Sequence, residues 1–557
     1  MMFNKNLEHI DNLALKRRLS KISPIESRLG ISYCVTPTND YVLLKDDLPA
    51  DDLQNPKEAV KQMLKNNIKN EMKPNDFIIT FGIGLGYLLD ETFNTYPSKI
   101  YIYEPDLNLL HFVLSNVDIS EHLSSGRVYI SNDLDELISK LNNTYLTKDK
   151  VEIVYLQNYA IVKNKELLLL TQKVLDTCKS KIVDINTIKK FSKVWLINTL
   201  QNIKAINTEE AYLLSDLENK FEGKTAIITG AGPSLAENIE KIKSKRENLV
   251  VFAVNKSVKY LLQNNIVPDF VVCLDARNME KTLGGLESHF ANCSAIADIR
   301  VDHTIFSKGF KKVFINFSET DFFIKKLNKY NNYMKFYESG GSASTLALTS
   351  AIKMGFSKVI LAGIDLAFKD NVIYAHGELM QRVSQDQMIV DNIRKNIVPV
   401  KSVKGDLVYT RDDYQAFISH FVTLIKELDF DNIYNISSFG ANIEGTKNVR
   451  FEDIELNESS NLACIDTIAP FKIEIKGFID EEFKSINEII SKLSKGDFSP
   501  ALATSVIKSV LVYQYMQAEI LNVLQKNFSQ DLAESFISTT KTTIKTVVEL
   551  LQKNKLI

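Results

Sequence analysis

Short apolar runs alternate with helical patterns through the middle of the chain. Five such runs are TAIIT (225–229), LVVFAV (249–254), DFVVCLD (269–275), KVFINF (312–317) and KVILAGID (358–365). Each run has the length and the β-branched content of a buried strand. Strands that alternate with helices favour a parallel sheet with helices on both faces. The pattern therefore predicts a central Rossmann-like α/β domain over residues 221–455.

The two flanking segments have different patterns. Before the centre, FIITFG (77–82) and KIYIYEPD (99–106) enclose a glycine turn and a helical stretch, which predicts an N-terminal Rossmann-like α/β domain over 1–190. Residues 191–220 carry the only tryptophan, Trp195, and are expected to be a helical connector. Residues 465–557 have no strand-like run, and their apolar positions recur at helical spacing, so we expect a helical bundle there.

Composition and charge narrow the class of protein. The 557 residues include 67 basic and 69 acidic side chains without a basic cluster, which gives no reason to expect a nucleic-acid partner. No run of about 18 apolar residues is present, so no membrane span is predicted. The five cysteines are scattered without a C-x-x-C pair, so neither a zinc site nor a disulfide framework is expected. Together with an N-terminus that lacks the apolar core of a signal peptide, these features predict a cytoplasmic protein.

The stretch TAIITGAGPSL is the strongest candidate for a binding turn. A predicted strand ends at Thr229, and the turn GAGPS, Gly230 to Ser234, follows it. Gly230 and Gly232 are expected to adopt backbone angles closed to other residues. Pro233 and Ser234 open a helix, with Ser234 and Glu237 as a capping box. Free N–H groups at a positive helix end suit a phosphate, and Ala231 lies within this turn. The alternative is a turn and a cap without a ligand.

Polar residues follow three of the predicted strands. Asn255 follows LVVFAV, Asp275 follows FVVCL, and Asp365 follows VILAGI, in which Gly363 comes two residues before Asp365. In an open parallel sheet, ligands bind beyond the carboxyl ends of the strands. We therefore expect these residues to line a site, although each of them alone could cap a helix or form a turn.

A second small-residue turn occurs in YESGGSASTLA (337–347). Ser339, Gly340 and Gly341 leave room for a phosphate or a ligand backbone. The alternative is a tight turn that opens a helix, with Ser342 or Ser344 as its cap.

The ordered motifs GAGPSL, AVNKS, PDFVVCLD, ESGGSASTLAL, VILAGIDLAF with YAHG, and NISSFGANIEGT resemble the motility accessory factors, the Maf flagellin glycosyltransferases. The central segment is also similar to bacterial sialyltransferases that use CMP-sialic acid. The resemblance implies transfer of a nonulosonic acid, of the pseudaminic or legionaminic type, from a CMP-activated donor to Ser or Thr of flagellin, in support of flagellar assembly and motility. It implies a donor site lined by Gly230, Gly232, Ser234, Asn255, Ser339, Gly340 and Asp365, to which we add Ala231, Pro233, Asp275, Gly341 and Gly363 from the same motifs.

The catalytic residues are less clear from this resemblance. Sialyltransferases have two tyrosines after the G-I-D motif; Tyr374 matches the second, whereas Ala367 stands in the place of the first. Their histidine base has no counterpart here at the matching distance. His376, in the polar turn IYAHGE, is our candidate base because an imidazole exchanges protons near neutral pH. A surface histidine without a role is the alternative, and the next histidine along the chain is His420.

Two D-x-D strings, Asp133 to Asp135 and Asp429 to Asp431, have the pattern with which many glycosyltransferases hold a divalent metal. The first lies outside the central segment and the second precedes a predicted strand. We expect both to be turn residues, so no metal ligand is assigned and the need for a metal stays open.

The N-terminal run FGIGLGY (81–87), with Glu104 at the end of the next strand, resembles the S-adenosylmethionine motif of methyltransferases or a loose dinucleotide fingerprint. A glycine fingerprint alone is weak support for a cofactor. We therefore expect this loop to be structural and not needed for chemistry.

Two other functions stay open at this point. A pterin pyrophosphokinase, such as a 6-hydroxymethyl-dihydropterin kinase, shares a related core, and Asp275 and Asp365 could hold its Mg²⁺. A non-enzymatic flagellin-binding adaptor would use the helical C-terminus as a docking surface. Neither glycine turn carries a lysine or arginine to neutralise a triphosphate, which favours the monophosphate of a CMP-sugar.

Overall fold

The computed structural model describes the whole chain except residues 1, 26, 27, 29, 278, 319, 320, 369–396, 457–461, 496–499, 525–529 and 557. The chain forms two compact units, Met1–Asn186 and Thr187–Ile557. Their boundary lies inside one 45-residue helix, α9 (Asn164–Thr208). The connector expected at 191–220 is therefore α-helical as far as Thr208, and β8 (Tyr212–Leu213) and a short 3-10 helix (Leu214–Leu217) follow.

The first unit is an α/β domain with a small parallel sheet, as predicted. Four strands lie in the order β6-β5-β4-β7, and a separate antiparallel sheet has the order β1-β2-β3. The elements of this unit that precede α9 are α1 (Met2–Glu8), α2 (Leu13–Leu19), β1 (Ile31–Val35), β2 (Tyr41–Lys45), β3 (Leu48–Pro49), α3 (Pro56–Asn67), β4 (Phe77–Phe81), α4 (Tyr87–Thr95), β5 (Lys99–Tyr103), α5 (Leu107–Asn116), α6 (Ser120–Ser124), β6 (Val128–Ser131), α7 (Leu134–Thr144), β7 (Val151–Tyr155) and α8 (Gln157–Val162).

The second unit is built on a nine-stranded sheet in the order β18-β17-β14-β9-β10-β11-β12-β13-β8. All of its strand pairs are parallel. Besides β8, the strands are β9 (Thr225–Thr229), β10 (Val250–Val254), β11 (Phe270–Cys273), β12 (Ser294–Asp298), β13 (Lys312–Asn316), β14 (Lys358–Ala362), β17 (Ile433–Asn435) and β18 (Lys447–Asn448). The five runs singled out in the sequence are the five strands β9, β10, β11, β13 and β14.

The strand order reverses beside β9. The chain runs outward from β9 through β10, β11, β12 and β13, and then returns to place β14 on the other side of β9. In open parallel sheets this kind of reversal leaves a crevice at the carboxyl ends of the two strands. The β9 and β14 loops are the ones that carry GAGPS and G-I-D.

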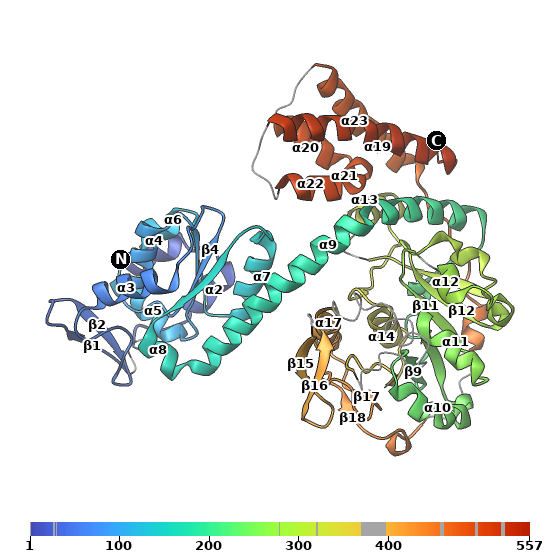
Figure 1. Ribbon diagram of the computed structural model, residues 1–557, viewed down its shortest axis with the longest axis horizontal. Coiled ribbons are helices and arrows are strands. Elements are labelled where there is room, and N and C mark those ends of the chain that lie inside the picture. Colours follow the sequence, from blue (N-terminus) through green and yellow to red (C-terminus); the bar gives the residue numbers. More distant parts are fainter. Residues whose placement is uncertain are drawn as a thin grey trace. The chain divides into compact units, whose positions relative to one another are not determined.

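Helices cover both faces of this sheet because alternate strand residues point to opposite sides (Figure 1). On one face Ile227 and Val251 pack with α10, α11, α12 and α13, whereas on the other Ile228 and Phe252 pack with α14 and α17. An antiparallel hairpin, β15 with β16, precedes α17. The bounds are α10 (Ser234–Ser244), α11 (Asn255–Gln263), α12 (Met279–Leu283), α13 (Phe322–Asn331), α14 (Ala343–Lys353), β15 (Ile397–Lys401), β16 (Leu407–Arg411) and α17 (Asp412–Leu428).

The elements described in the C-terminal segment are all helices, as predicted (red in Figure 1). It does not stand apart from the central domain, because Phe478, Ile486 and Val547 belong to the same apolar core as β9 and β10. No helix in the described ranges is long and apolar enough to cross a membrane. The helices are α18 (Ala463–Asp466), α19 (Lys476–Ser494), α20 (Pro500–Lys508), α21 (Val510–Tyr515), α22 (Gln517–Leu524) and α23 (Gln530–Lys553).

Candidate active site

The predicted site residues gather at the carboxyl edge of the nine-stranded sheet. Strands β14, β9, β10 and β11 are consecutive neighbours, and Asp365, Gly230, Asn255 and Asp275 follow their ends in that order. Asn255 is the first residue of α11. Asp275 is exposed, whereas Asp365 is only 2% exposed. The expected convergence at one edge is therefore present, but Asp365 lies beneath the surface.

The glycines of the GAGPS turn serve close backbone approach. The Gly230 N–H donates to Ala362 O at 2.8 Å, and the Gly232 N–H donates to Gly363 O at 2.8 Å. A Cβ at Gly232 would lie 2.4 Å from Asp365 Oδ2, and one at Gly230 would lie 2.3 Å from Gly363 O. Neither glycine has a positive φ, so the expectation of unusual backbone angles was wrong. Gly363 is the glycine that has one, at +67°.

Asp365 joins the GAGPS turn to the loop after β17. Its carboxylate accepts hydrogen bonds from the Ser234 N–H at 2.9 Å, from the Ser234 hydroxyl and from the Ser437 hydroxyl at 2.7 Å. Burial raises the pKa of Asp365, and the two serines oppose that rise. The Gly440 N–H donates to Ser437 Oγ at 3.0 Å, which holds the second loop in place. Asp365 is thus a positioning residue in this arrangement.

The capping box expected at the start of α10 is absent. Pro233 is the N-cap residue and makes no side-chain cap. The Ser234 hydroxyl donates to Asp365 instead, and Glu237 accepts a hydrogen bond from the Ser438 hydroxyl. The carboxylate of Asp365 therefore takes the place at the positive helix end where the sequence suggested a phosphate.

Few donors remain for a ligand in the first turn. Pro233 has no N–H group, and those of Gly230, Gly232 and Ser234 are used within the protein. Within the part of the chain that the structure describes, the Ala231 N–H alone among residues 230–234 has no hydrogen-bond partner. The GAGPS turn therefore serves mainly the packing of the protein, and it offers a ligand one N–H donor.

The second turn is more open. Ser342 caps α14 in a capping box with Thr345, which agrees with the capping alternative considered above. Ser339 is buried, and its carbonyl accepts from the Thr345 hydroxyl. Gly340 and Gly341 both have positive φ, +54° and +75°. The two glycines lead directly into the first turn of α14, a helix of 11 residues.

Four N–H groups of this second turn are available. Among the described residues, the N–H groups of Gly340, Gly341, Ala343 and Ser344 make no hydrogen bond. Successive N–H groups in such a turn, together with a helix N-terminus, form an anion-binding concavity. The structure therefore favours 340–344 over 230–234 as the place for a phosphate.

A histidine from a distant part of the chain lies beside this turn. A Cβ on Gly341 would be 3.9 Å from His420 Nδ1. His420 is half-buried on α17, and its Nδ1 has no hydrogen-bond partner within the described part of the chain. No local sequence signal marks it, because α17 reaches the turn only by packing on α14. His376 and Tyr374 lie outside the described residues, so their roles stay predictions.

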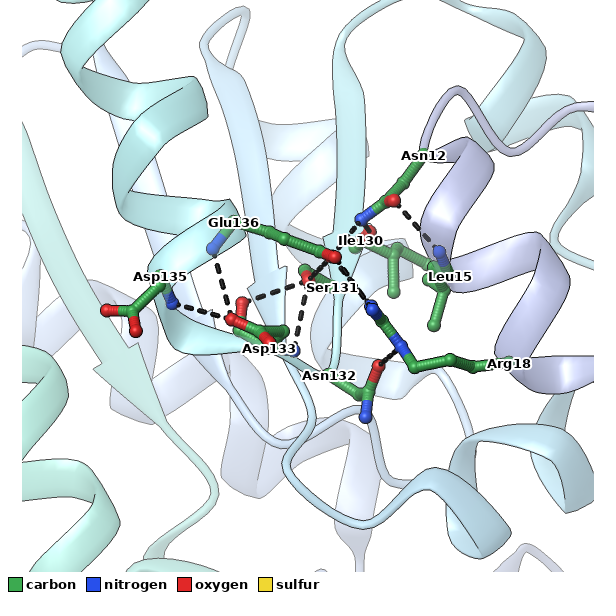
Figure 2. A network of polar contacts seen from close by, with 9 residues as sticks. All are labelled: Asn12, Leu15, Arg18, Ile130, Ser131, Asn132, Asp133, Asp135 and Glu136. Atoms are coloured by element: carbon green, nitrogen blue, oxygen red, sulfur yellow. Dashed lines mark hydrogen bonds and ion pairs between the residues drawn. The ribbon is translucent and has the colours of Figure 1, made fainter. Parts of the chain in front are cut away.

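The first D-x-D string belongs to a structural network (Figure 2). Asp133 caps α7 by accepting from the Asp135 N–H at 2.9 Å and the Glu136 N–H at 3.2 Å. Glu136 faces away from it and is held by Arg18 through two hydrogen bonds, at 2.7 and 2.6 Å. The Arg18 guanidinium lowers the pKa of Glu136 to about 2.

The second D-x-D string is also a helix-end feature. Asp429 is the C-cap of α17 with a left-handed backbone, φ +49°, and it precedes β17. It therefore lies at the amino edge of the sheet, opposite the glycine turns. Across the described residues, no three His, Cys, Asp or Glu side chains are grouped so that they could hold a metal ion.

The glycine loop of the first unit is filled by the protein's own side chains. Glu104 is fully buried, and its carboxylate accepts from the Ile83 N–H at 3.2 Å, the Asp106 N–H at 2.9 Å and the Tyr159 hydroxyl. Burial raises the pKa of Glu104 to about 7. A Cβ on Gly82 would lie 2.7 Å from the ring of Tyr159. The acid that would bind a ribose is thus engaged inside the domain.

A second carboxyl group lies on the other side of the same loop. Asp51 is 5% exposed, and a Cβ on Gly84 would lie 2.7 Å from its Oδ2. Burial raises the pKa of Asp51 to about 7, with a hydrogen bond from the Leu85 backbone acting against the rise. These contacts do not fit an S-adenosylmethionine or dinucleotide cofactor at this loop.

The whole chain is similar to a solved structure, the MAf glycosyltransferase from Magnetospirillum magneticum AMB-1. The two share 15% sequence identity with a TM-score of 0.62, and the match covers 100% of this chain and 96% of that one. The chain has the Maf fold. The family resemblance drawn from the motifs is therefore confirmed at the level of fold, across both units and the C-terminal helices.

Two sequence comparisons cover smaller parts of this Maf fold. The family model for MptE-like proteins, described as 6-hydroxymethylpterin diphosphokinase MptE-like, matches residues 197–371. An uncharacterised protein of Treponema pallidum (strain Nichols) is 34% identical over 85 residues, which are 15% of this chain and 39% of that protein. The chain thus matches less than half of the length of this relative.

Proposed function

We propose that this protein is a glycosyltransferase that moves a nonulosonic acid from a CMP-activated donor to Ser or Thr residues of flagellin. The observation that carries the proposal is the fold likeness to a Maf glycosyltransferase over the full chain. The diphosphokinase family model matches only the central part and leaves out the first unit and the C-terminal helices. The donor sugar and the acceptor come from the family resemblance.

The site supports a donor with one phosphate. The free N–H groups at 340–344 form one anion-binding place at the start of α14. As the acceptor hydroxyl attacks the anomeric carbon, the CMP phosphate departs with its negative charge toward these donors. They are fixed by the capping box of Ser342 and Thr345 before the reaction starts. Such fixed donors stabilise developing charge without reorganisation.

A base must remove the proton of the acceptor hydroxyl. His376 is the first candidate and His420 the second, because His420 Nδ1 lies unpartnered next to Gly341. Loss of a general base lowers turnover by roughly 10²- to 10⁴-fold. His376→Ala and His420→Ala are therefore each assayed for sugar transfer, with the exposed His289, before β12 at the amino edge, as control. Parental rates in both variants would show that neither residue is the base.

One specific observation favours a diphosphokinase as the alternative function: the family model that matches residues 197–371. The two functions require different ligands, since a diphosphokinase must hold Mg-ATP. Thermal shift assays with CMP, CDP and Mg-ATP separate them, because a ligand at about 100 times its Kd stabilises by about 2.7 kcal/mol. We expect the larger shift with a cytidine nucleotide. A larger shift with Mg-ATP would favour the diphosphokinase.

The acceptor is tested in the organism itself. Mass spectrometry of flagellin from a strain without this protein should show peptides that have lost a nonulosonic acid. Complementation with the wild-type chain should restore that mass, and the His420→Ala and His376→Ala chains should report which base is needed. Flagellin of unchanged mass in the deletion strain would exclude flagellin as the acceptor.

A further inference from the structure

Helix α9 carries two apolar faces in the first unit, although its packing there uses only one. Leu170 and Val174 are buried in the core of this unit. On another face Leu168, Leu175 and Ile182 recur at every seventh position and are 64%, 50% and 44% exposed. Leu169 and Val183 extend this exposed face. We name Leu168, Leu169, Leu175, Ile182 and Val183 the α9 stripe.

A seven-residue repeat of apolar positions is the pattern of helices that pair with another helix. A single surface helix needs one apolar face to pack on its domain, and large side chains exposed in a continuous row mark an interaction site. Three successive heptads of exposed aliphatic residues therefore indicate that the α9 stripe is covered by a further helix.

The charged residues next to the α9 stripe indicate what kind of helix covers it. Lys165 precedes Leu168 and Leu169 by three and four residues, and Lys179 has the same relation to Ile182 and Val183. Residues three or four apart are neighbours on a helix surface, so both lysines lie between the rows of the stripe. Both are exposed, and neither forms an ion pair within the described residues. Asp176, three residues before Lys179, accepts hydrogen bonds from the Gln172 amide at 2.9 Å.

We propose that the α9 stripe binds an amphipathic helix of a partner protein, with apolar residues at heptad spacing flanked by acidic residues. A second copy of this chain fits less well when two α9 stripes pair in parallel and in register, because Lys165 then faces Lys165 and Lys179 faces Lys179. Like charges at neighbouring positions of paired helices destabilise the pair. Acidic residues on the partner helix satisfy the same lysines.

The test uses the full chain and two synthetic helical peptides as probes. Both peptides carry leucines in four heptads; one has Glu and the other has Lys at the flanking positions. Fluorescence anisotropy should show that the Glu peptide binds about tenfold or more tightly than the Lys peptide, since several cross-helix ion pairs add up. Lys165→Glu with Lys179→Glu should reverse the preference, and Leu168→Gln with Leu175→Gln should abolish binding of both peptides.

The control is Ile490→Gln, which changes an exposed aliphatic residue on α19 and should leave peptide binding unchanged. Equal affinity for both peptides, or no binding of either, would overturn the proposal. A dimer in light scattering that Leu175→Gln converts to a monomer would assign the stripe to a second copy. A fall of several degrees in the Tm of the monomeric Leu168→Gln, Leu175→Gln protein would show that the chain itself covers the stripe, and would also overturn the proposal.

Discussion

The glycine loop at 82–86 and the glycine turn at 339–342 look alike in sequence and differ in what surrounds them. In the first unit, Glu104 accepts from the Ile83 N–H, Asp51 accepts from the Leu85 backbone, and the side chains of Asp51 and Tyr159 occupy the space next to Gly84 and Gly82. In the second unit, the N–H groups of Gly340 and Gly341 have no hydrogen-bond partner among the described residues. A glycine turn therefore indicates a binding site only where the protein does not already supply the anion.

The GAGPS turn falls between these two cases. It lies at the point of strand reversal, where a ligand is expected, yet the carboxylate of Asp365 already meets the start of α10. The three turns thus form a series from filled, through nearly filled, to open. Each member of the series predicts a different response to substitution.

The largest effect is expected in the open turn. Gly341→Asp places a negative charge beside the proposed phosphate, so the affinity for CDP should fall by at least about 100-fold, or about 2.8 kcal/mol. Isothermal titration calorimetry measures this. Gly223→Asp is the matched control, because Gly223 has nearly the same φ, +76° against +75°, and precedes β9 at the opposite edge. Equal losses of affinity in the two variants would remove the open turn from the donor site.

The filled loop should respond to pH. The pKa of Glu104 is about 7 in the folded protein and about 4.5 when exposed, so the folded state holds its proton more tightly. Glu104 should then lower the stability of the first unit by about 2 kcal/mol as pH rises from 5 to 7. Asp51, whose pKa is also about 7, should add a similar fall, so Glu104→Gln should remove about half of the dependence. Hydrogen exchange of the β4 and β5 amides measures the stability of the first unit. Tryptophan fluorescence would not, because the only tryptophan lies in the second unit. The exposed Glu121→Gln is the control.

A wild-type profile that does not change between pH 5 and 7 would contradict the buried, neutral state of Glu104. Tight binding of S-adenosylmethionine to the chain would break the comparison more directly, because it requires the side chains around Gly82 and Gly84 to leave.

The intermediate turn should affect stability more than affinity. Ser437→Ala removes one donor to Asp365 and leaves the Gly440 N–H without its acceptor, which should cost about 1 to 2 kcal/mol. Urea unfolding followed by Trp195 fluorescence measures the loss. Ser438→Ala is the control, since this neighbour is exposed and should change stability by less than about 0.5 kcal/mol. A CDP affinity that falls in Ser437→Ala with unchanged stability would mean that this loop contacts the donor.

The smallest effect on stability is expected for the ion pair beside the first D-x-D string, which has a structural role only. The Arg18–Glu136 pair lowers the pKa of Glu136 from 4.5 to about 2, so its contribution is present above about pH 4.5 and is lost toward pH 2. Both side chains are partly exposed, and Arg18→Met should cost about 1 kcal/mol near pH 7. Lys5→Met, which breaks a more exposed ion pair of the same unit, should change nothing measurable. Hydrogen exchange of α7 amides distinguishes the two, and equal effects would contradict the structural role of Glu136.

The sequence predicted what depends on local pattern. Hydrophobic runs identified strands β9, β10, β11, β13 and β14, and residues after those runs do meet at one edge, because parallel strands share that edge. The helical spacing after residue 465 predicted the C-terminal helices. The family motifs predicted the Maf fold, which the full-length structural likeness confirms.

Contacts between distant segments could not be predicted in this way. Ser234 suggested a capping box with Glu237 because the two are three residues apart, whereas its partner in the structure, Asp365, is 131 residues away. Tyr159 and Glu104 meet across 55 residues. His420 reaches Gly341 only through the packing of α17 on α14. Such contacts depend on tertiary packing, and the spacing of apolar residues along the sequence does not reveal which distant segments meet.

The crowding around Gly230 and Gly232 has a consequence for how such proteins are grouped. Any chain that brings these two backbones so close must leave out the side chains there, whether it transfers a sugar or a pyrophosphate. A search that relies on GAGPSL therefore collects proteins by architecture, and members with different chemistry can share it. Residues that distinguish one reaction from another are better sought around Gly340 and Gly341. Substitutions there do not disturb the close packing of the loops after β9 and β14.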